Sequence, residues 1–286
     1  GYWSLPNSTK RFRDWRKGGH GMTNLNKAIT ESSDTYFYQT AYNMGIDRLS
    51  AWMKRFGFGV PTGIDIQEET GANMPTREWK QKRYKKAWVQ GDTISVGIGQ
   101  GYWTATPLQL AKATSILVNN GKVNTPHLMK SVEGSVVEPY KDPLPYEDIT
   151  EPKQYFWDEA KRGMYNVVNS AGGTGRKAFI GTPYRVAGKS GTAQVFSLKE
   201  NQSYNAGALK KELHDHAWFI AFAPYETPQI VVSMILENAG GGSSNAAPIV
   251  RKIMDYYFKQ NTPLPIEQSS EQPLSEPTRG EPNENE

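Results

Sequence analysis

The stretch "YRVAGKSGTAQVF" (184–196) decides the fold, because Gly-Lys-Ser occurs in two unrelated kinds of site. In a phosphate-binding loop these residues end a Walker motif and open a helix. In a serine acyl-transfer enzyme, Lys-Ser/Thr-Gly lies on a strand that borders the substrate cleft. The residues after Ser190 continue as a strand pattern, and Pro183 stands where a Walker loop needs its first glycine. The stretch therefore predicts a strand and excludes a phosphate loop.

The region that follows has the same two-residue period. "HAWFIAFAP" (216–224) and "QIVVSMILE" (229–237) alternate and are rich in β-branched and aromatic residues. Together with 184–196 they predict three consecutive strands of an antiparallel sheet. "NAAPIVRKIMDYYFKQ" (245–260) has an amphipathic helical pattern and predicts a closing helix.

The region before the strands has helical patterns separated by glycines and capping residues. Helices are predicted within 25–30, 35–45, 48–57, 107–121 and 157–175. Ser32-Ser33-Asp34 forms the junction between the first two, with Asp34 as the N-cap of the second. A helical block, a strand block and a final helix indicate an α+β fold, in which an antiparallel sheet is flanked by helices.

Composition limits the chemistry and the folded part of the chain. The 286 residues contain no cysteine, which excludes disulfides, thiolate catalysis and zinc–thiolate sites. No run of about 18 apolar residues occurs, so no membrane span is predicted. Residues 261–286 hold six Glu, five Pro and one Arg, with almost nothing apolar. Because such a segment cannot offset its ordering entropy by burial, we expect a folded domain over 1–260 and a disordered acidic tail over 261–286.

The folded part is basic. Removing the net charge of −5 in the tail from the whole-chain +4 leaves about +9 for the body. Such a charge is compatible with an anionic substrate, a membrane surface or nucleic acid. The densest basic run, "REWKQKRYKKAW" (77–88), is expected to be a solvated loop. Because no nucleic-acid-binding module accompanies it, we expect no nucleic-acid partner.

Two motifs of a serine acyl-transfer site occur in the expected order. Lys189-Ser190-Gly191 lies on a predicted strand, and Ser32-Ser33-Asp34 is a variant of Ser-x-Asn between two predicted helices. Alone, the first is commonly a turn at a strand edge, and the second is commonly a helix cap. Their joint occurrence, each in the right structural context, favours the acyl-transfer interpretation.

Four longer stretches of the sequence resemble a known family. "ESSDTYFYQTAYNMGIDRL", "VGIGQGYWTATPLQLA", "GGTG" before "VAGKSGTAQV", and "DHAWFIAFAP" resemble the transpeptidase domain of class B penicillin-binding proteins, most of all the elongation type, penicillin-binding protein 2. The resemblance implies the penicillin-binding/serine β-lactamase-like transpeptidase fold. It also implies D,D-transpeptidation of peptidoglycan stem peptides, covalent inhibition by β-lactams, and partnership with a lipid-II polymerase and scaffold proteins of the elongation complex. The implied location is the periplasmic face of the bacterial inner membrane, with an N-terminal anchor outside this chain.

One family motif is missing. No serine in the chain is followed by lysine three residues later, so the nucleophile motif Ser-x-x-Lys is absent. In the family this motif precedes Ser-x-Asn, so here it would precede Gly1. We therefore expect a partial domain, the C-terminal part of the enzyme, which is catalytically inactive by itself.

The resemblance assigns roles to the motifs that are present. Ser32 would relay protons between the lysine base and the leaving amine, and Asp34 would replace the usual asparagine. Lys189 would supply positive charge, and Ser190 and Thr192 hydroxyls, for the carboxylate of D-Ala-D-Ala or of a β-lactam. The backbone N–H of Thr192 would form half of the oxyanion hole. Gly191 would leave room for the substrate along the strand.

The resemblance also raises the question of a structural zinc ion, although the reaction itself requires no cofactor. In some members a zinc site uses two aspartates, a histidine and a cysteine. Asp14 and His20 match two of these ligands, but the cysteine position is Ser33, and serine is a poor zinc ligand. A plain salt bridge or hydrogen bond within the loop is the alternative. His214 and His216 are expected to make hydrogen bonds at a strand start.

Two other functions stay open at this stage. The first is a β-lactamase or β-lactam sensor domain of the same fold, although no dedicated deacylation base is evident and "GQGYWTATPLQLA" favours the synthase. The second is a non-catalytic fragment that binds partners. Slow release of a labelled penicillin from the full-length protein would distinguish a transpeptidase from a rapidly turning-over hydrolase.

Overall fold

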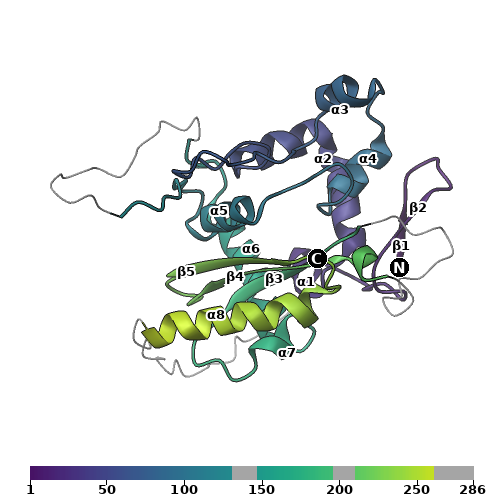
Figure 1. Ribbon diagram of the computed structural model, residues 1–286. Helices are drawn as coiled ribbons and strands as arrows, with labels where there is room; N and C mark the ends of the chain where they lie inside the picture. The colour runs from purple at the N-terminus through teal and green to yellow at the C-terminus, as the bar shows by residue number, and fades with distance from the viewer. Residues whose placement is uncertain (131–146, 196–209, 261–286) are drawn as a thin grey trace, which may run out of the picture.

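The computed structural model describes residues 1–130, 147–195 and 210–260, so the predicted tail at 261–286 lies outside the described residues. Its centre is an antiparallel sheet in the order β3-β4-β5, formed by Ala187–Ala193, His216–Ala223 and Ile230–Leu236 (Figure 1). The register places Ser190 opposite Phe219. The three strands predicted from alternation are therefore confirmed, and β3 contains the Lys-Ser-Gly motif.

Helices cover both faces of this sheet (Figure 1). The flanking helices are α5 (Pro107–Val118), α6 (Gln154–Asn169), α7 (Arg176–Phe179) and α8 (Ala247–Gln260). Because side chains alternate along a strand, Ala217, Phe219 and Ala221 of β4 join the buried cluster that includes α8. Phe222 belongs to a second cluster with Met164 of α6. The alternation that predicted the strands thus also divides the core into two layers, as expected for an α+β fold.

A helical region stands above the sheet in Figure 1. It contains α2 (Asp34–Arg55), α3 (Arg77–Tyr84) and α4 (Gln90–Val96), whereas α1 (Leu25–Glu31) packs against α6. Gly45 has a non-helical backbone with a φ of 72°, which bends α2 where the sequence predicted two helices. Ser33 and not Asp34 occupies the N-cap position of α2, so the predicted cap is wrong by one residue. Asp34 opens the helix, and its carboxylate accepts a hydrogen bond from Trp15 N–H instead.

The basic run at 77–88 was expected to be a solvated loop; most of its residues are exposed as expected, but most of it is a helix and not a loop. Arg77–Tyr84 is a helix whose N-cap Thr76 accepts a hydrogen bond from the backbone of Trp79. Lys80 is buried, and its ammonium contacts Asp92 and lies 5.8 Å from the ring centre of Trp88. Lys80 is the one buried residue of this helix. Its burial is stable because the ammonium is paired with a carboxylate and lies over aromatic rings.

The remaining elements are short. They are the hairpin of β1 (Tyr2–Ser4) and β2 (Arg11–Arg13), the 3-10 helix Lys211–Leu213 and the π-helix Gly242–Ala246. Sequence patterns did not predict the hairpin, because strands of this length carry almost no periodicity. Within the described ranges, no helix has the length and apolar character that crossing a membrane requires.

Candidate active site

The two motifs meet in one open cavity of about 1830 Å³. Its lining comes from the β1–β2 hairpin, the α1–α2 junction, the turn after α4, the "GGTG" turn before α7, strand β3 and the segment Gly241–Ser243. Ser32, Asp34, Lys189, Ser190, Gly191 and Thr192 all contribute to this lining. The predicted site residues are therefore brought together from positions far apart in the chain.

One side of the cavity, here called the strand half, consists of Lys189–Thr192 of β3 together with Thr174. The Lys189 ammonium donates to Ser32 Oγ at 2.8 Å and to the carbonyl of Ser190 at 2.8 Å. The Thr174 and Ser190 hydroxyls are 2.9 Å apart. Lys189, Ser190 and Thr174 thus line the same cavity at the edge of the sheet. Such a cluster of one ammonium and two hydroxyls suits a carboxylate ligand.

Thr174 owes its position to the two glycines beside it. A Cβ built on Gly173 would lie 2.4 Å from the carbonyl oxygens of Asn166 and Val167, and one on Gly175 would lie 3.0 Å from Phe219. The turn therefore packs against α6 and β4 only because these positions have no side chain. The Gly175 N–H donates to the carbonyl of Val167 at 2.9 Å. The turn is rigid, and it aims the Thr174 hydroxyl at Ser190.

Gly191 is required by the neighbouring strand as well as by the cavity. A Cβ at this position would lie 3.1 Å from Cβ of Trp218, its partner on β4. Gly242 is tighter still, because a Cβ there would lie 2.0 Å from the carbonyl oxygen of Trp218. These glycines let the π-helix segment close over the end of β3 and β4.

The other side, here called the junction half, consists of Ser32–Thr35 together with Asp14, His20 and Glu31. Ser32 ends α1 in the left-handed region, with a φ of 58°. Its carbonyl accepts a 2.8 Å hydrogen bond from the indole of Trp15. A non-glycine residue in this region is strained by about 1–2 kcal/mol. In this conformation the Ser32 hydroxyl accepts a hydrogen bond from Lys189.

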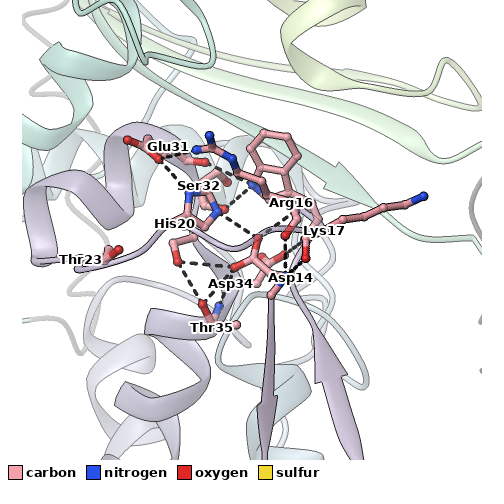
Figure 2. A network of polar contacts seen from close by, with 12 residues as sticks. Asp14, Arg16, Lys17, His20, Thr23, Glu31, Ser32, Asp34 and Thr35 are labelled. Atoms are coloured by element: carbon pink, nitrogen blue, oxygen red, sulfur yellow. Dashed lines mark hydrogen bonds and ion pairs between the residues drawn. The ribbon is translucent and has the colours of Figure 1, made fainter.

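A buried polar network supports this junction (Figure 2). His20 has one ring nitrogen 3.0 Å from Asp14 and the other 2.8 Å from Glu31. The second oxygen of Asp14 accepts from the N–H and the hydroxyl of Thr35, each at 3.1 Å. Through His20 and Asp14, the segment after β2 is therefore tied to the end of α1 and to the start of α2.

Comparison with known proteins decides the family. Residues 2–255 match the family described as the penicillin binding protein transpeptidase domain. The chain belongs to this family. The resemblance and the α+β penicillin-binding fold expected from the sequence are both confirmed.

This transpeptidase domain has close relatives. The peptidoglycan D,D-transpeptidase MrdA of Haemophilus influenzae is 76% identical over 277 residues, which are 95% of this chain and 42% of MrdA. Pseudomonas aeruginosa PBP2, solved in complex with WCK 5153, is 43% identical with a TM-score of 0.80, over 90% of this chain and 54% of that one. Helicobacter pylori PBP2, solved in complex with MreC, is 33% identical with a TM-score of 0.76, over 92% of this chain and 44% of that one. The chain thus spans about two fifths of the length of MrdA.

Burial shifts two titrating groups of the transpeptidase domain toward neutrality. Burial, with the nearby charge of Asp14, raises the pKa of Asp34 to about 6. Burial lowers the pKa of Lys189 to about 8, although the charge of Asp34 opposes this shift. Asp14 behaves differently: burial raises its pKa, but hydrogen bonds from Arg16, Thr35 and His20 outweigh this and hold the pKa below its usual value. The cavity therefore contains a lysine that can exchange a proton near neutral pH.

The residues present do not fit a zinc ion. Asp14 and His20 are adjacent, as the sequence suggested, but both nitrogens of His20 are already bonded to carboxylates. Ser33 Oγ is 3.5 Å from Asp14 and is no thiolate. Among the residues that the structure describes, no group of three His, Cys, Asp or Glu side chains could hold a metal ion. No step is therefore assigned to a metal.

Several contributors were not found from the sequence. Thr174 lies in the quoted "GGTG" stretch but received no role, and the Trp15 indole contacts Glu31 and Ser32 without any motif to mark it. Gln100 donates to the carbonyl of Thr192 at 2.8 Å. His216, in contrast, behaves as expected: its ring accepts from the N–H of Asn238 at 2.9 Å, a hydrogen bond at a strand start.

Proposed function

We propose that the protein containing this chain is a peptidoglycan D,D-transpeptidase that cross-links stem peptides through a serine acyl-enzyme during cell elongation. The observation that carries the proposal is the 2.8 Å hydrogen bond between Lys189 and Ser32, which joins two motifs separated by 157 residues. The similarity to MrdA supports the same activity. It also disfavours the β-lactamase and sensor alternatives.

The strand half binds the acyl donor in this proposal. Lys189, Ser190 and Thr174 hold the terminal carboxylate of D-Ala-D-Ala or the acid group of a β-lactam. Thr192 offers its backbone N–H to the reacting carbonyl, where negative charge develops in the transition state. Preorganised donors on a sheet are effective because they need no reorganisation during the reaction.

The junction half moves the proton. A nucleophilic serine and its lysine come from a part of the protein outside this chain, because no Ser-x-x-Lys occurs among the 286 residues. As the serine oxygen forms its bond to the donor carbonyl and the amide bond breaks, the proton of that serine passes through its lysine and the Ser32 hydroxyl to the departing D-alanine nitrogen, while Lys189 hydrogen-bonds Ser32. Asp34 when ionised favours the charged form of Lys189.

Location and partners follow from the same proposal. We place the protein at the periplasmic face of the bacterial inner membrane, beside a lipid-II polymerase and a scaffold protein of the elongation complex. The relative from Helicobacter pylori was solved together with MreC, which supports a scaffold partner of this kind. Co-purification of the full-length protein with such a scaffold from detergent extracts tests this part.

The test of the activity is acylation of the full-length protein by a fluorescent penicillin. A stable, slowly released label is expected, together with cross-linked dimers from stem-peptide substrates. Ser32→Ala should reduce dimer formation, while the same substitution at Ser115 on α5 should not. Rapid turnover of the penicillin would establish a β-lactamase instead, and no labelling at all would reject both enzymes.

A further inference from the structure

The carbonyl of Thr192 is already occupied at the open edge of the sheet. In the order β3-β4-β5, strand β3 pairs on one side only, with β4. The carbonyl of Ser190 accepts a hydrogen bond from Lys189, and the carbonyl of Thr192 accepts one from Gln100. Both carbonyls therefore point away from β4. Within a strand, the N–H and C=O of one residue point to the same side. The backbone N–H of Thr192 therefore also faces the open edge.

Gln100 is presented to this edge by a rigid turn. Gly99 and Gly101 on either side of it have φ values of 75° and 71°, in the left-handed region where glycine is favoured. The Gln100 N–H donates to the carbonyl of Ser95 at 3.0 Å, which fastens the turn to the end of α4. The Asn73 side chain also bonds the carbonyl of Tyr102 at 2.7 Å. The backbone of Gln100 is therefore held in place, and its carboxamide reaches the carbonyl of Thr192.

A donor peptide would need the same acceptor. In an antiparallel pair, two opposed residues exchange both of their N–H···O hydrogen bonds. If the reacting carbonyl of a donor accepts from Thr192 N–H, the N–H of that same donor residue falls on the carbonyl of Thr192. In this structure Gln100 Nε2 holds that position at 2.8 Å.

We propose that Gln100 is a placeholder for the amide of the acyl donor. In the free cleft its carboxamide donates to the carbonyl of Thr192, and it leaves this carbonyl when a donor binds along β3. The inference rests on the proposed function, and it makes Gln100 a positioning residue that sets how tightly donors bind. It is separate from the carboxylate contacts of Lys189 and Ser190. Removal of the Gln100 carboxamide should therefore strengthen donor binding, whereas removal of a residue that binds the donor would weaken it.

The experiment uses the full-length protein and a fluorescent penicillin, which carries an amide N–H beside its reacting carbonyl. Gln100→Met keeps the side-chain length but cannot donate, and Gln100→Ala removes the group. Because one exchanged hydrogen bond is worth about 0.5–1.5 kcal/mol, both variants should bind the penicillin about 2- to 10-fold more tightly, with the rate of the acylation step itself unchanged. Gln90→Met, the same change on the exposed start of α4, is the matched control and should have no effect.

The possible outcomes separate the two proposals. Unchanged or weaker binding in both Gln100 variants, at an unchanged melting temperature, would overturn the placeholder role and leave the transpeptidase proposal intact. If the variants do not fold, a crystal structure of the acylated wild-type protein decides: loss of the Gln100–Thr192 hydrogen bond supports the inference, and its retention overturns it. A wild-type protein that is not acylated would remove both proposals together.

Discussion

The two halves of the candidate site are built by different physical means. The strand half is held by backbone hydrogen bonds of β3 with β4 and by glycines whose missing side chains allow close packing. The junction half is held by side chains, with His20 between Asp14 and Glu31. Backbone ladders do not titrate and tolerate most side-chain changes, whereas a buried network of carboxylates and imidazole depends on each member. Substitutions in the strand half should therefore reduce function without reducing stability, whereas loss of His20 from the network with Asp14 and Glu31 should reduce both.

The largest expected effect is on acylation in the strand half. Lys189→Met should lower the rate of penicillin acylation by about 100-fold or more, because a buried charged hydrogen bond to the donor is lost. The fold should persist, since the ladder of β3 remains and a buried ammonium is removed. Acylation kinetics and a thermal melt of the full-length protein measure the two effects. Lys177→Met, at an exposed position on α7, is the control. A collapsed melting temperature would mean that this half also depends on its side chains.

In the junction half, the largest effect should be on stability. His20→Ala leaves two carboxylates, Asp14 and Glu31, without their shared partner, and breaking a buried polar pair costs about 3 kcal/mol or more. Denaturant unfolding should show this loss, with slower acylation because Ser32 is no longer held. His127→Ala removes an exposed imidazole and should be nearly neutral. Equal stability of the two variants would contradict the network interpretation.

A pH-dependent effect should appear at Asp34. The folded pKa of about 6 lies above the ordinary value of 3.8, so ionisation costs stability as the pH rises through this window. Asp34→Asn should therefore be more stable than wild type at pH 7 by on the order of 2 kcal/mol, and nearly equal to it at pH 4. Unfolding curves at the two pH values measure this. Asp47→Asn breaks an exposed ion pair with Arg77 and should cost less than about 1 kcal/mol at pH 7.

The smallest expected effect concerns the backbone of Ser32. Both Ser32→Ala and Ser32→Gly remove the hydroxyl, so both should slow the transfer reaction to the same extent. Glycine adopts the left-handed region without the cost of a Cβ, so Ser32→Gly should be about 0.5–1 kcal/mol more stable than Ser32→Ala. Equal stabilities of the two variants would show that the φ of 58° carries no strain.

Much of the fold was predictable because it is local. The alternation at 216–224 and 229–237 predicted β4 and β5, and the helical pattern within 107–121 predicted α5, whose N-cap Thr106 makes its capping hydrogen bonds. The helix at Arg77–Tyr84 was missed because its charges resemble a solvated loop, and only the burial of Lys80 against Asp92 reveals its inner face. The hairpin of β1 and β2 was missed because its strands are three residues long.

The candidate site was also predictable only in part from the sequence. The sequence by itself determined which groups are available, namely the lysine and hydroxyls of 189–192 and the junction Ser32–Asp34, because motifs and strand periodicity are local properties. Only the tertiary structure decided that Lys189 lies 2.8 Å from Ser32, that Thr174 and Trp15 support them, and that Gln100 occupies the Thr192 carbonyl. Those contacts join residues far apart in the chain. Burial and neighbouring charge, which set the pKa values of Asp34 and Lys189, exist only once the chain has packed.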